Sequence, residues 1–233
     1  MGKRIISQAR GHGSLSYRVR RKAYSHKIKY PMINNGTAEI ISLIHSAGHT
    51  APLMKLKSGN ETFINSAFNG AFVGQKITIG GNVSEAGNIL ALKDIALGSQ
   101  IYNIERNPGD GGKMMRSSGT SAILNKRYDH NVIGVLMPSK KEILLAGDCR
   151  ATVGVVAGDG RLLKPYMTAG RKYYKMKARN KLWPRTSAVK MNAVDHPFGS
   201  GRGKRIKSKI AKRNSPPGTR VGHIRPRRTG RKN

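Results

Sequence analysis

The distribution of charge along this chain limits which part of it can fold into a compact core. Of its 233 residues, 44 are Lys or Arg and 11 are Asp or Glu, giving a formal net charge of +33. Residues 1–31 hold nine basic and no acidic side chains, residues 32–98 hold four of each, and residues 166–233 hold 21 basic and one acidic. Because like charges repel, we expect a folded middle with long basic N- and C-terminal extensions.

Such extensions need a polyanion to neutralise them, and nucleic acid is the obvious one. A membrane surface is the alternative, but the ends lack the apolar face of an interfacial helix. We find no run of 18 apolar residues and no signal-peptide core, and we expect a cytoplasmic protein without a membrane partner. Cys149 is the only cysteine, and the histidines show no ligand spacing, so we expect no disulfide, metal or cofactor.

The middle of the chain is predicted to be mostly β, with few helices. Short apolar or alternating segments are separated by Gly-containing turns, which is typical of small barrels. Residues 36–97 suggest one barrel, possibly of the OB type, and residues 98–170 suggest a second small barrel. The expected strands cover residues 38–44, 51–56, 72–79, 101–106, 121–124, 132–137, 142–145 and 152–156.

The extensions contain less regular structure. Residues 1–35 are predicted to form an arm without regular elements, since Gly2, Gly11 and Gly13 interrupt it. Tyr17, Tyr24 and Tyr30 alternate there with basic residues, and they can either stack on unpaired bases or anchor the arm on the protein. Residues 171–233 form the C-terminal part: one short basic helix over residues 171–182, a Gly-rich loop, and a tail ordered only on its partner.

The Gly-rich loop spans residues 191–203, where Gly199, Gly201 and Gly203 allow close approach of the backbone to another surface. Asp195-His196 is the one pair in it with chemical possibilities. His196 could act as a general base oriented by the carboxylate, but neighbouring side chains diverge, and no nucleophile accompanies them. We therefore expect a shaped loop in which Asp195 caps local amides and His196 hydrogen-bonds RNA, not an enzyme active site.

A second candidate contact is the segment Arg116-Ser117-Ser118-Gly119-Thr120. A cation beside small hydroxyl groups and a glycine can lie against a phosphate backbone, binding it with side chains and amides. The same pattern also occurs in ordinary surface turns, and the residues alone leave both interpretations open.

Several segments resemble one known family. Met191-Asn192-Ala193-Val194-Asp195-His196-Pro197, followed by Gly199-x-Gly201, resembles the signature of the second protein of the large ribosomal subunit, the L-two family. Further segments match in family order: Gly87-Asn88, Ile95-x-Leu97-Gly98, Asn107-Pro108-Gly109-x-Gly111-Gly112, Arg116-Ser117-Ser118-Gly119-Thr120, Gly147-Asp148-Cys149-Arg150-Ala151-Thr152-Val153-Gly154 and Lys177-Ala178-Arg179-Asn180. The resemblance covers most of the chain, and its opening residues resemble the archaeal type.

This resemblance implies an OB-like barrel followed by an SH3-like barrel, and a structural, ribosome-bound protein that binds large-subunit rRNA. It implies support of subunit association, tRNA binding and peptide-bond formation, with small-subunit rRNA at the interface, other ribosomal proteins and, indirectly, tRNA as partners. His196 matches the loop histidine near the peptidyl-transferase region, which has been suspected of catalysis. The expected rRNA-binding residues are Arg18, Arg20, Arg21, Arg116, Ser117, Ser118, Arg150, Arg179, Asn180, Asn192, His196, Gly199, Gly201, Arg202, Lys204 and Arg205.

Two positions depart from the family pattern. Phe198 stands where the bacterial pattern has a second His, which argues against a mechanism that needs both. Near Asn34-Asn35-Gly36 the family usually has an Arg, so one phosphate contact is missing or moved. A generic nucleic-acid-binding protein, such as a chromatin protein, is the remaining alternative, and it would bind many duplexes without preference for rRNA.

Overall fold

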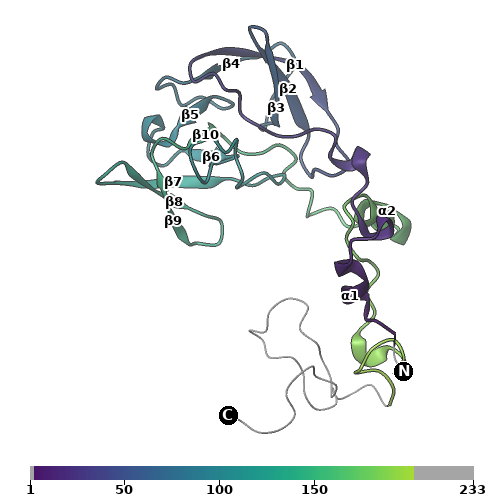
Figure 1. Ribbon diagram of the computed structural model, residues 1–233. Helices are drawn as coiled ribbons and strands as arrows, with labels where there is room; N and C mark the ends of the chain where they lie inside the picture. The colour runs from purple at the N-terminus through teal and green to yellow at the C-terminus, as the bar shows by residue number, and fades with distance from the viewer. Residues whose placement is uncertain (1–2, 202–233) are drawn as a thin grey trace. The chain divides into compact units, whose positions relative to one another are not determined.

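The computed structural model describes residues 3–201 (Figure 1). The chain divides into two compact units, and each is described by itself. We call Arg20–Lys172 the β unit, and Met1–Val19 together with Tyr173–Asn233 the terminal unit. No helix in the described part of the chain is long and apolar enough to cross a membrane.

Ten strands of the β unit form one hydrogen-bonded series, in the order β3-β2-β1-β4-β5-β10-β6-β7-β8-β9. This mostly β architecture, consistent with OB-like and SH3-like folds, confirms the predicted fold class. The strands are β1 (Gly36–Ile44), β2 (Leu53–Ser58), β3 (Glu61–Ser66), β4 (Lys76–Ile79), β5 (Ile89–Ala91), β6 (Gln100–Tyr102), β7 (Ala122–Tyr128), β8 (Val132–Leu136), β9 (Glu142–Ala146) and β10 (Arg150–Val153). A 3₁₀ turn, Leu92–Asp94, follows β5.

Neighbouring strands pair antiparallel except β4 and β5, which meet in parallel at Ile79 and Ile89. In β2, Leu53 and Met54 are buried, Leu56 and Ser58 are buried further along, and Lys55 and Lys57 are exposed. β1 carries a bulge between Ile40 and Ser42, where its register against β2 shifts. The two-residue alternation thus gives most of β2 an apolar inner face and a basic outer face.

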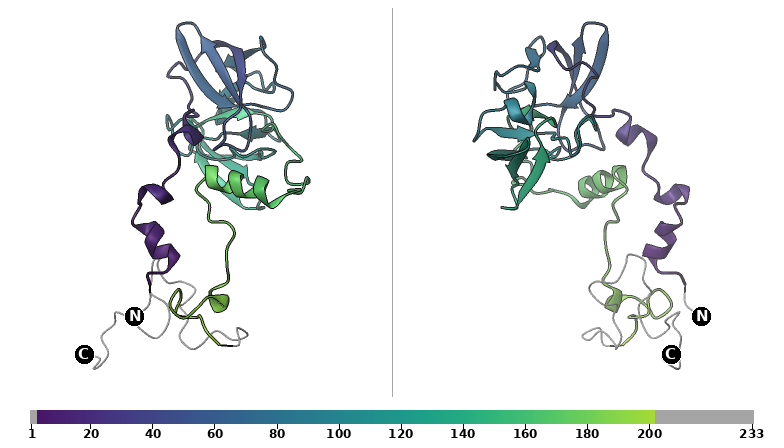
Figure 2. Two further views of the ribbon diagram at one scale, coloured as in Figure 1. Left: turned by 90° about the vertical axis from the view of Figure 1, so that its right-hand side faces the viewer. Right: turned by 60° about the vertical axis from the view of Figure 1, so that its left-hand side comes forward.

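Two groups of buried side chains form the core. One joins β1–β4 and includes Ile40, Leu56 and Ile79, together with Tyr102 from β6. The other is built on β6–β10 and includes residues such as Leu124 and Val135. Figure 2 shows the blue strands of residues 36–79 beside the teal and green strands of residues 100–153.

Some predicted boundaries were wrong. The strand expected over residues 72–79 begins only at Lys76, because Phe72 and Val73 are exposed in a turn that closes at Gly74 (φ 87°). The amide of Gly74 donates to the Ile40 carbonyl, and this bond holds the turn against β1. Strands β3 and β5 were not predicted.

The first arm is also more regular than expected. Residues 1–35 were predicted without regular elements, but Ile6–Gly11 forms helix α1, and short 3₁₀ turns cover Leu15–Tyr17 and Arg21–Tyr24. Gly11 ends α1, and Gly13 (φ 67°) follows it. Glycines at the end of a short helix are compatible with it, whereas glycines in its middle would oppose it.

The basic helix predicted over residues 171–182 is α2, Ala169–Ala178, which begins earlier and ends earlier. Its end forms a Schellman cap, because the amides of Asn180 and Lys181 donate to the carbonyls of Lys177 and Met176. Asn180 has φ 52°, the left-handed conformation that such a cap requires. A short 3₁₀ turn, Ala188–Lys190, precedes the Gly-rich loop.

Candidate RNA-binding surface

One buried carboxylate organises the surface loops of the β unit. Glu105 is fully buried, and its Oε1 and Oε2 accept hydrogen bonds from the amides of Gly111 (3.0 Å), Gly109 (3.2 Å) and Arg150 (2.9 Å). Nη2 of Arg150 donates to Oε1 at 3.2 Å. These donors satisfy a charge that would otherwise be costly to bury, so Glu105 fixes the loop of residues 106–112 to β10.

A second carboxylate shapes the same loop from within. Asp110 accepts from the amides of Arg106 (3.0 Å), Asn107 (3.2 Å) and Gly112 (3.0 Å). Gly112 has φ 87°, and a Cβ there would lie 2.4 Å from Oδ1 of Asn103. The loop is therefore folded by its own side chains before any ligand binds.

Arg116 contacts the base of this loop. Its Nη1 donates to the Gly112 carbonyl at 3.1 Å, and its Nη2 donates to the Ile28 carbonyl at 3.4 Å. The side chain is half-buried, and this desolvation lowers the pKa of the Arg116 guanidinium. Its contacts thus join the loop of residues 106–112 to residue 28 in the first arm.

The hydroxyl residues after Arg116 lie at the surface. Ser117 is exposed, while the amide of Ser118 donates to Oγ1 of Thr50 (3.0 Å) and its Oγ accepts from Nε of Arg161 (2.7 Å). Gly119 packs so closely that a Cβ would lie 2.7 Å from Oδ1 of Asp159. This segment is a rigid turn with one exposed hydroxyl and the nearby Arg161 cation.

Arg150 lies over a buried tyrosine. Its guanidinium carbon is 5.3 Å from the ring centre of Tyr30, its Nη1 donates to the Pro31 carbonyl at 2.8 Å, and its side chain is only 15% exposed. The contacts of Arg150 therefore fasten residues 30 and 31 to the β unit.

Tyr30 also answers the question left open by the tyrosines of the first arm. It is buried, and its hydroxyl donates to the Asn103 carbonyl (2.7 Å) and bonds Thr152 (2.8 Å), so it anchors the arm. Burial raises the pKa of Tyr30. Tyr24 is partly exposed, with its ring edge on His49, and Tyr17 lies below the guanidinium of Arg10.

A polar network continues from Tyr30 into the core. Nδ2 of Asn65 donates to Thr152 at 3.0 Å, and Nδ2 of Asn103 donates to Oδ1 of Asn65 at 2.9 Å. Nothing in the sequence pattern indicated Asn65, Asn103 or Glu105 as key residues. A single acidic residue in an apolar strand segment was the one available signal for Glu105.

In the terminal unit, the loop of residues 191–201 is closed by backbone bonds. The Asn192 carbonyl accepts from the amides of Asp195 (3.0 Å) and His196 (3.2 Å), and the Met191 carbonyl accepts from Ser200 (3.0 Å). Gly199 is buried, and a Cβ there would lie 2.3 Å from the Asn192 carbonyl oxygen. Gly201 follows with φ 88°. Here glycine is needed at position 199 because of close packing.

Asp195 does not play the predicted capping role in this loop. Its Oδ1 pairs with Nζ of Lys3 at 3.3 Å, and the amide of Lys3 donates to the Val194 carbonyl at 2.8 Å. The carbonyl of Asn192 accepts from the local amides instead. Lys3 and Asp195 are both well exposed, so their pairing adds little stability.

His196 is held in a defined protonation state by its neighbour. The amide of Phe198 donates to Nδ1 at 3.1 Å, and the two rings lie 5.0 Å apart. Because Nδ1 accepts this bond, a neutral ring carries its proton on Nε2 and presents a donor there. Partial burial lowers the pKa of His196, which favours this neutral ring.

The remaining expected residues lie in several places. Arg18, Arg20 and Arg21 are exposed, and Arg18 bonds the Gly13 carbonyl through Nε. Asn180 caps α2, and its carbonyl accepts from Arg10 at 2.7 Å, while the neighbouring Arg179 is half-buried. Arg202, Lys204 and Arg205 lie outside the described residues.

The structure thus gathers the expected residues into separate clusters. Arg116, Ser117 and Ser118 share one turn of the β unit, and Asn192, His196 and Gly199 share one loop of the terminal unit. Within residues 3–201, no group of three or more His, Cys, Asp or Glu side chains could hold a metal ion.

Comparison with known proteins agrees with this arrangement of motifs. Residues 85–218 match a family described as Ribosomal Proteins L2, C-terminal domain. A protein of Archaeoglobus fulgidus named large ribosomal subunit protein uL2 is 45% identical over 236 residues, covering 99% of both chains. Proteins of the same name are similar in Hyperthermus butylicus (44%, covering 100% of this chain and 99% of the relative) and Methanococcoides burtonii (43%, covering 100% of both).

Proposed function

The chain belongs to the ribosomal protein L2 family, and on this basis we propose that it is a structural constituent of the large ribosomal subunit, working within the cytoplasmic ribosome as an rRNA-binding protein. The observation that carries this proposal is the match over nearly the whole chain to proteins named large ribosomal subunit protein uL2. The charge of +33, concentrated in the two extensions, supports RNA as the partner.

Two kinds of contact divide the work in this proposal. The folded turns, such as Arg116-Ser117-Ser118 and the loop of residues 191–201, recognise the shape and backbone of rRNA. The exposed cations of the first arm, including Arg18, Arg20 and Arg21, neutralise phosphates. Arg116 and Arg150 act through the loops that they hold in place, since their guanidinium groups donate to protein carbonyls and to Glu105.

The finer role of the protein is to organise rRNA near the peptidyl-transferase centre. There it would support subunit association, the binding of tRNA and peptide-bond formation, with small-subunit rRNA and other ribosomal proteins as neighbours. A scaffold suffices for such support, because positioning two bound substrates can supply most of the rate of their reaction.

The enzyme-like alternative gives His196 a proton-transfer role. The geometry favours a donor instead, because Nδ1 already accepts the Phe198 amide and Asp195 is paired with Lys3. His196→Gln is the variant that tests this. We expect assembly and peptide transfer to be retained or lost together, whereas normal assembly with no peptide transfer would support the enzyme-like role.

Chemical footprinting of the full chain on whole large-subunit rRNA, at moderate salt, tests the main proposal. We expect protection at a few rRNA sites, and we expect Arg116→Ala to weaken protection at one of them, because the loop of residues 106–112 loses a support. Ser117→Ala, which removes only the exposed hydroxyl, is the milder companion variant.

Duplex RNA of unrelated sequence serves as the competitor in this experiment. Protection that survives an excess of competitor supports specific binding. Diffuse protection that fades evenly with salt would instead identify a generic nucleic-acid-binding protein.

A further inference from the structure

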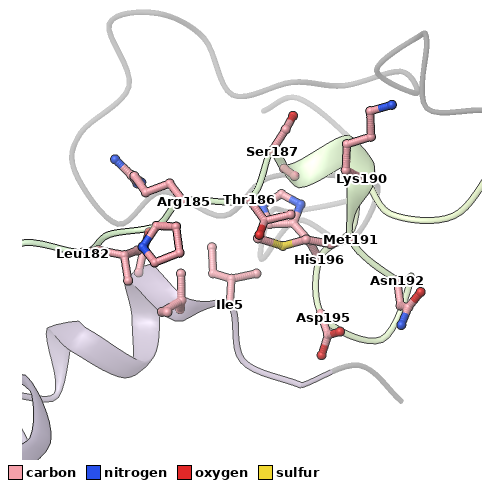
Figure 3. A pocket seen from close by; sticks show the side chains of 14 residues that line it. Ile5, Leu182, Arg185, Thr186, Ser187, Lys190, Met191, Asn192, Asp195 and His196 are labelled. Atoms are coloured by element: carbon pink, nitrogen blue, oxygen red, sulfur yellow. The ribbon is translucent and has the colours of Figure 1, made fainter. Parts of the chain in front are cut away.

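The terminal unit contains a cavity that none of the contacts above uses. It measures about 860 Å³ and lies between the start of α1 and residues 182–196. Ile5, Leu182 and Met191 contribute apolar walls, and Figure 3 shows Ile5 and Met191 near its middle. Its volume falls within the ~300–1,000 Å³ of typical small-ligand pockets, so it has room for a nucleoside.

Two polar groups face this apolar space. Figure 3 shows Thr186 and His196 close to the centre of the cavity lining. A threonine hydroxyl both donates and accepts hydrogen bonds, and His196 offers Nε2–H because Nδ1 is occupied by the Phe198 amide. Together they can bond the edge of a heterocycle whose faces lie against Ile5 and Met191.

Cations stand on both sides of the cavity. Arg185 and Lys190 are exposed lining residues, and Figure 3 shows their side chains pointing outward in different directions. A base inserted from an RNA strand carries one phosphate before it and one after it. The two cations match that pair of phosphates, which a protein side chain in the cavity would not supply.

We propose that this cavity binds one unpaired nucleobase of the rRNA, with Ile5 and Met191 against its faces, Thr186 and His196 at its edge, and Arg185 and Lys190 on the flanking phosphates. This inference rests on the proposed function and adds to it a base-specific contact. Sequence-specific recognition of RNA commonly targets such unstacked bases, and burying one is worth roughly five- to a hundredfold in affinity.

Base-specific chemical modification of the complex of full chain and large-subunit rRNA tests the proposal. Ala188 lines the cavity, and Ala188→Trp should fill it. We expect one or two nucleotides to be protected by the unaltered chain and to regain reactivity with Ala188→Trp, while the rest of the footprint stays. Ala47→Trp is the matched control, since it adds the same ring at an exposed position in the β unit.

Thr186→Ala is the second variant, because it removes one hydroxyl from the exposed side chain and cannot crowd the fold. It should raise the reactivity of the same nucleotides severalfold. If both variants leave every protected base unchanged, or if ultraviolet crosslinks from residues 182–191 lead only to protein, the cavity does not bind a base. A complete lack of footprint with the unaltered chain would instead overturn the proposed function itself.

Discussion

At the scale of single residues, Glu105 shows how this protein uses buried charge. Its carboxylate accepts from three backbone amides and from Arg150, and it is fully buried. Arg150 in turn holds Pro31 and covers Tyr30. One acidic side chain therefore joins β10, the loop of residues 106–112 and the first arm, so its loss should be felt in all three.

We predict that Glu105→Gln lowers the free energy of unfolding by about 3 kcal/mol, because the amide leaves Arg150 without a charged partner and turns an NH₂ group toward backbone donors. Urea unfolding measures this change. Lys93→Met is the control, since it breaks the exposed pair of Lys93 and Asp148, and it should leave the midpoint unchanged. Equal effects of the two variants would contradict the role given to Glu105.

His196 makes a prediction about pH. Desolvation lowers its pKa in the folded chain, so the folded state favours the neutral ring more than the unfolded state does. The resulting stability is present above the unfolded pKa of about 6.5 and is lost as the pH falls through and below it. An NMR titration should give a lower midpoint for His196 in the free folded chain than in urea.

The same titration reports on the hydrogen bond to His196. Protonation of Nδ1 removes the acceptor of the Phe198 amide, so the Phe198 amide shift should move with the same midpoint. A midpoint equal to or above that of the unfolded chain would show that the ring is solvated and that the loop does not hold it.

At the scale of elements, the strands show what an alternating pattern can and cannot reveal. The pattern located β2, β7, β8 and β9 within a few residues of their bounds. β3 was missed because Asn65 and Ser66 are buried in it, Asn65 in a side-chain network and Ser66 beneath Tyr102, so its polar residues do not mark a solvent face. Phe72 and Val73 misled in the opposite way, being apolar but exposed.

The candidate sites were predictable to a similar extent. The motifs pointed to the Arg116 turn and to the loop of residues 191–201. They could not show that Glu105 supports loops separated from it by up to 45 residues, because such pairing depends on the fold. Nor could they show that the cavity behind the loop joins Ile5 to residues 182–196.

The loop of residues 191–201 should depend on Gly199 because of packing. A Cβ at this position would lie 2.3 Å from the Asn192 carbonyl oxygen and 2.5 Å from that of Met191, and both are backbone atoms that cannot rotate away. We predict that Gly199→Ala displaces the loop, at a cost of about 1–3 kcal/mol. NMR shifts of residues 191–201 should change, and the rRNA footprint assigned to this loop should weaken.

Gly11→Ala provides the control for this variant, because nothing lies within 4 Å of the added Cβ. It should leave the loop shifts and the footprint as they were. Unchanged shifts in Gly199→Ala would mean that the loop adjusts easily, and its shape could then not be what rRNA recognises.

At the scale of the whole molecule, the net charge of +33 makes binding a salt-dependent process. Each phosphate neutralised by a cation releases counterions, which contributes about −0.7 to −0.9 to the slope of log affinity against log salt concentration. The exposed cations Arg18, Arg20 and Arg21 should account for three such contacts. Their combined replacement should therefore alter the slope in a way that can be counted.

We predict that the triple variant Arg18→Gln, Arg20→Gln, Arg21→Gln reduces the magnitude of the slope by roughly 2 to 3, while the protected rRNA sites stay the same. Filter binding over a range of salt concentrations measures the slope. The triple Arg→Lys variant keeps the charges and should keep the slope, which separates neutralisation from geometry. If the Gln variant kept the full slope, the first arm would not lie on phosphates; if it lost the protected sites, these arginines would specify the site as well as neutralise it.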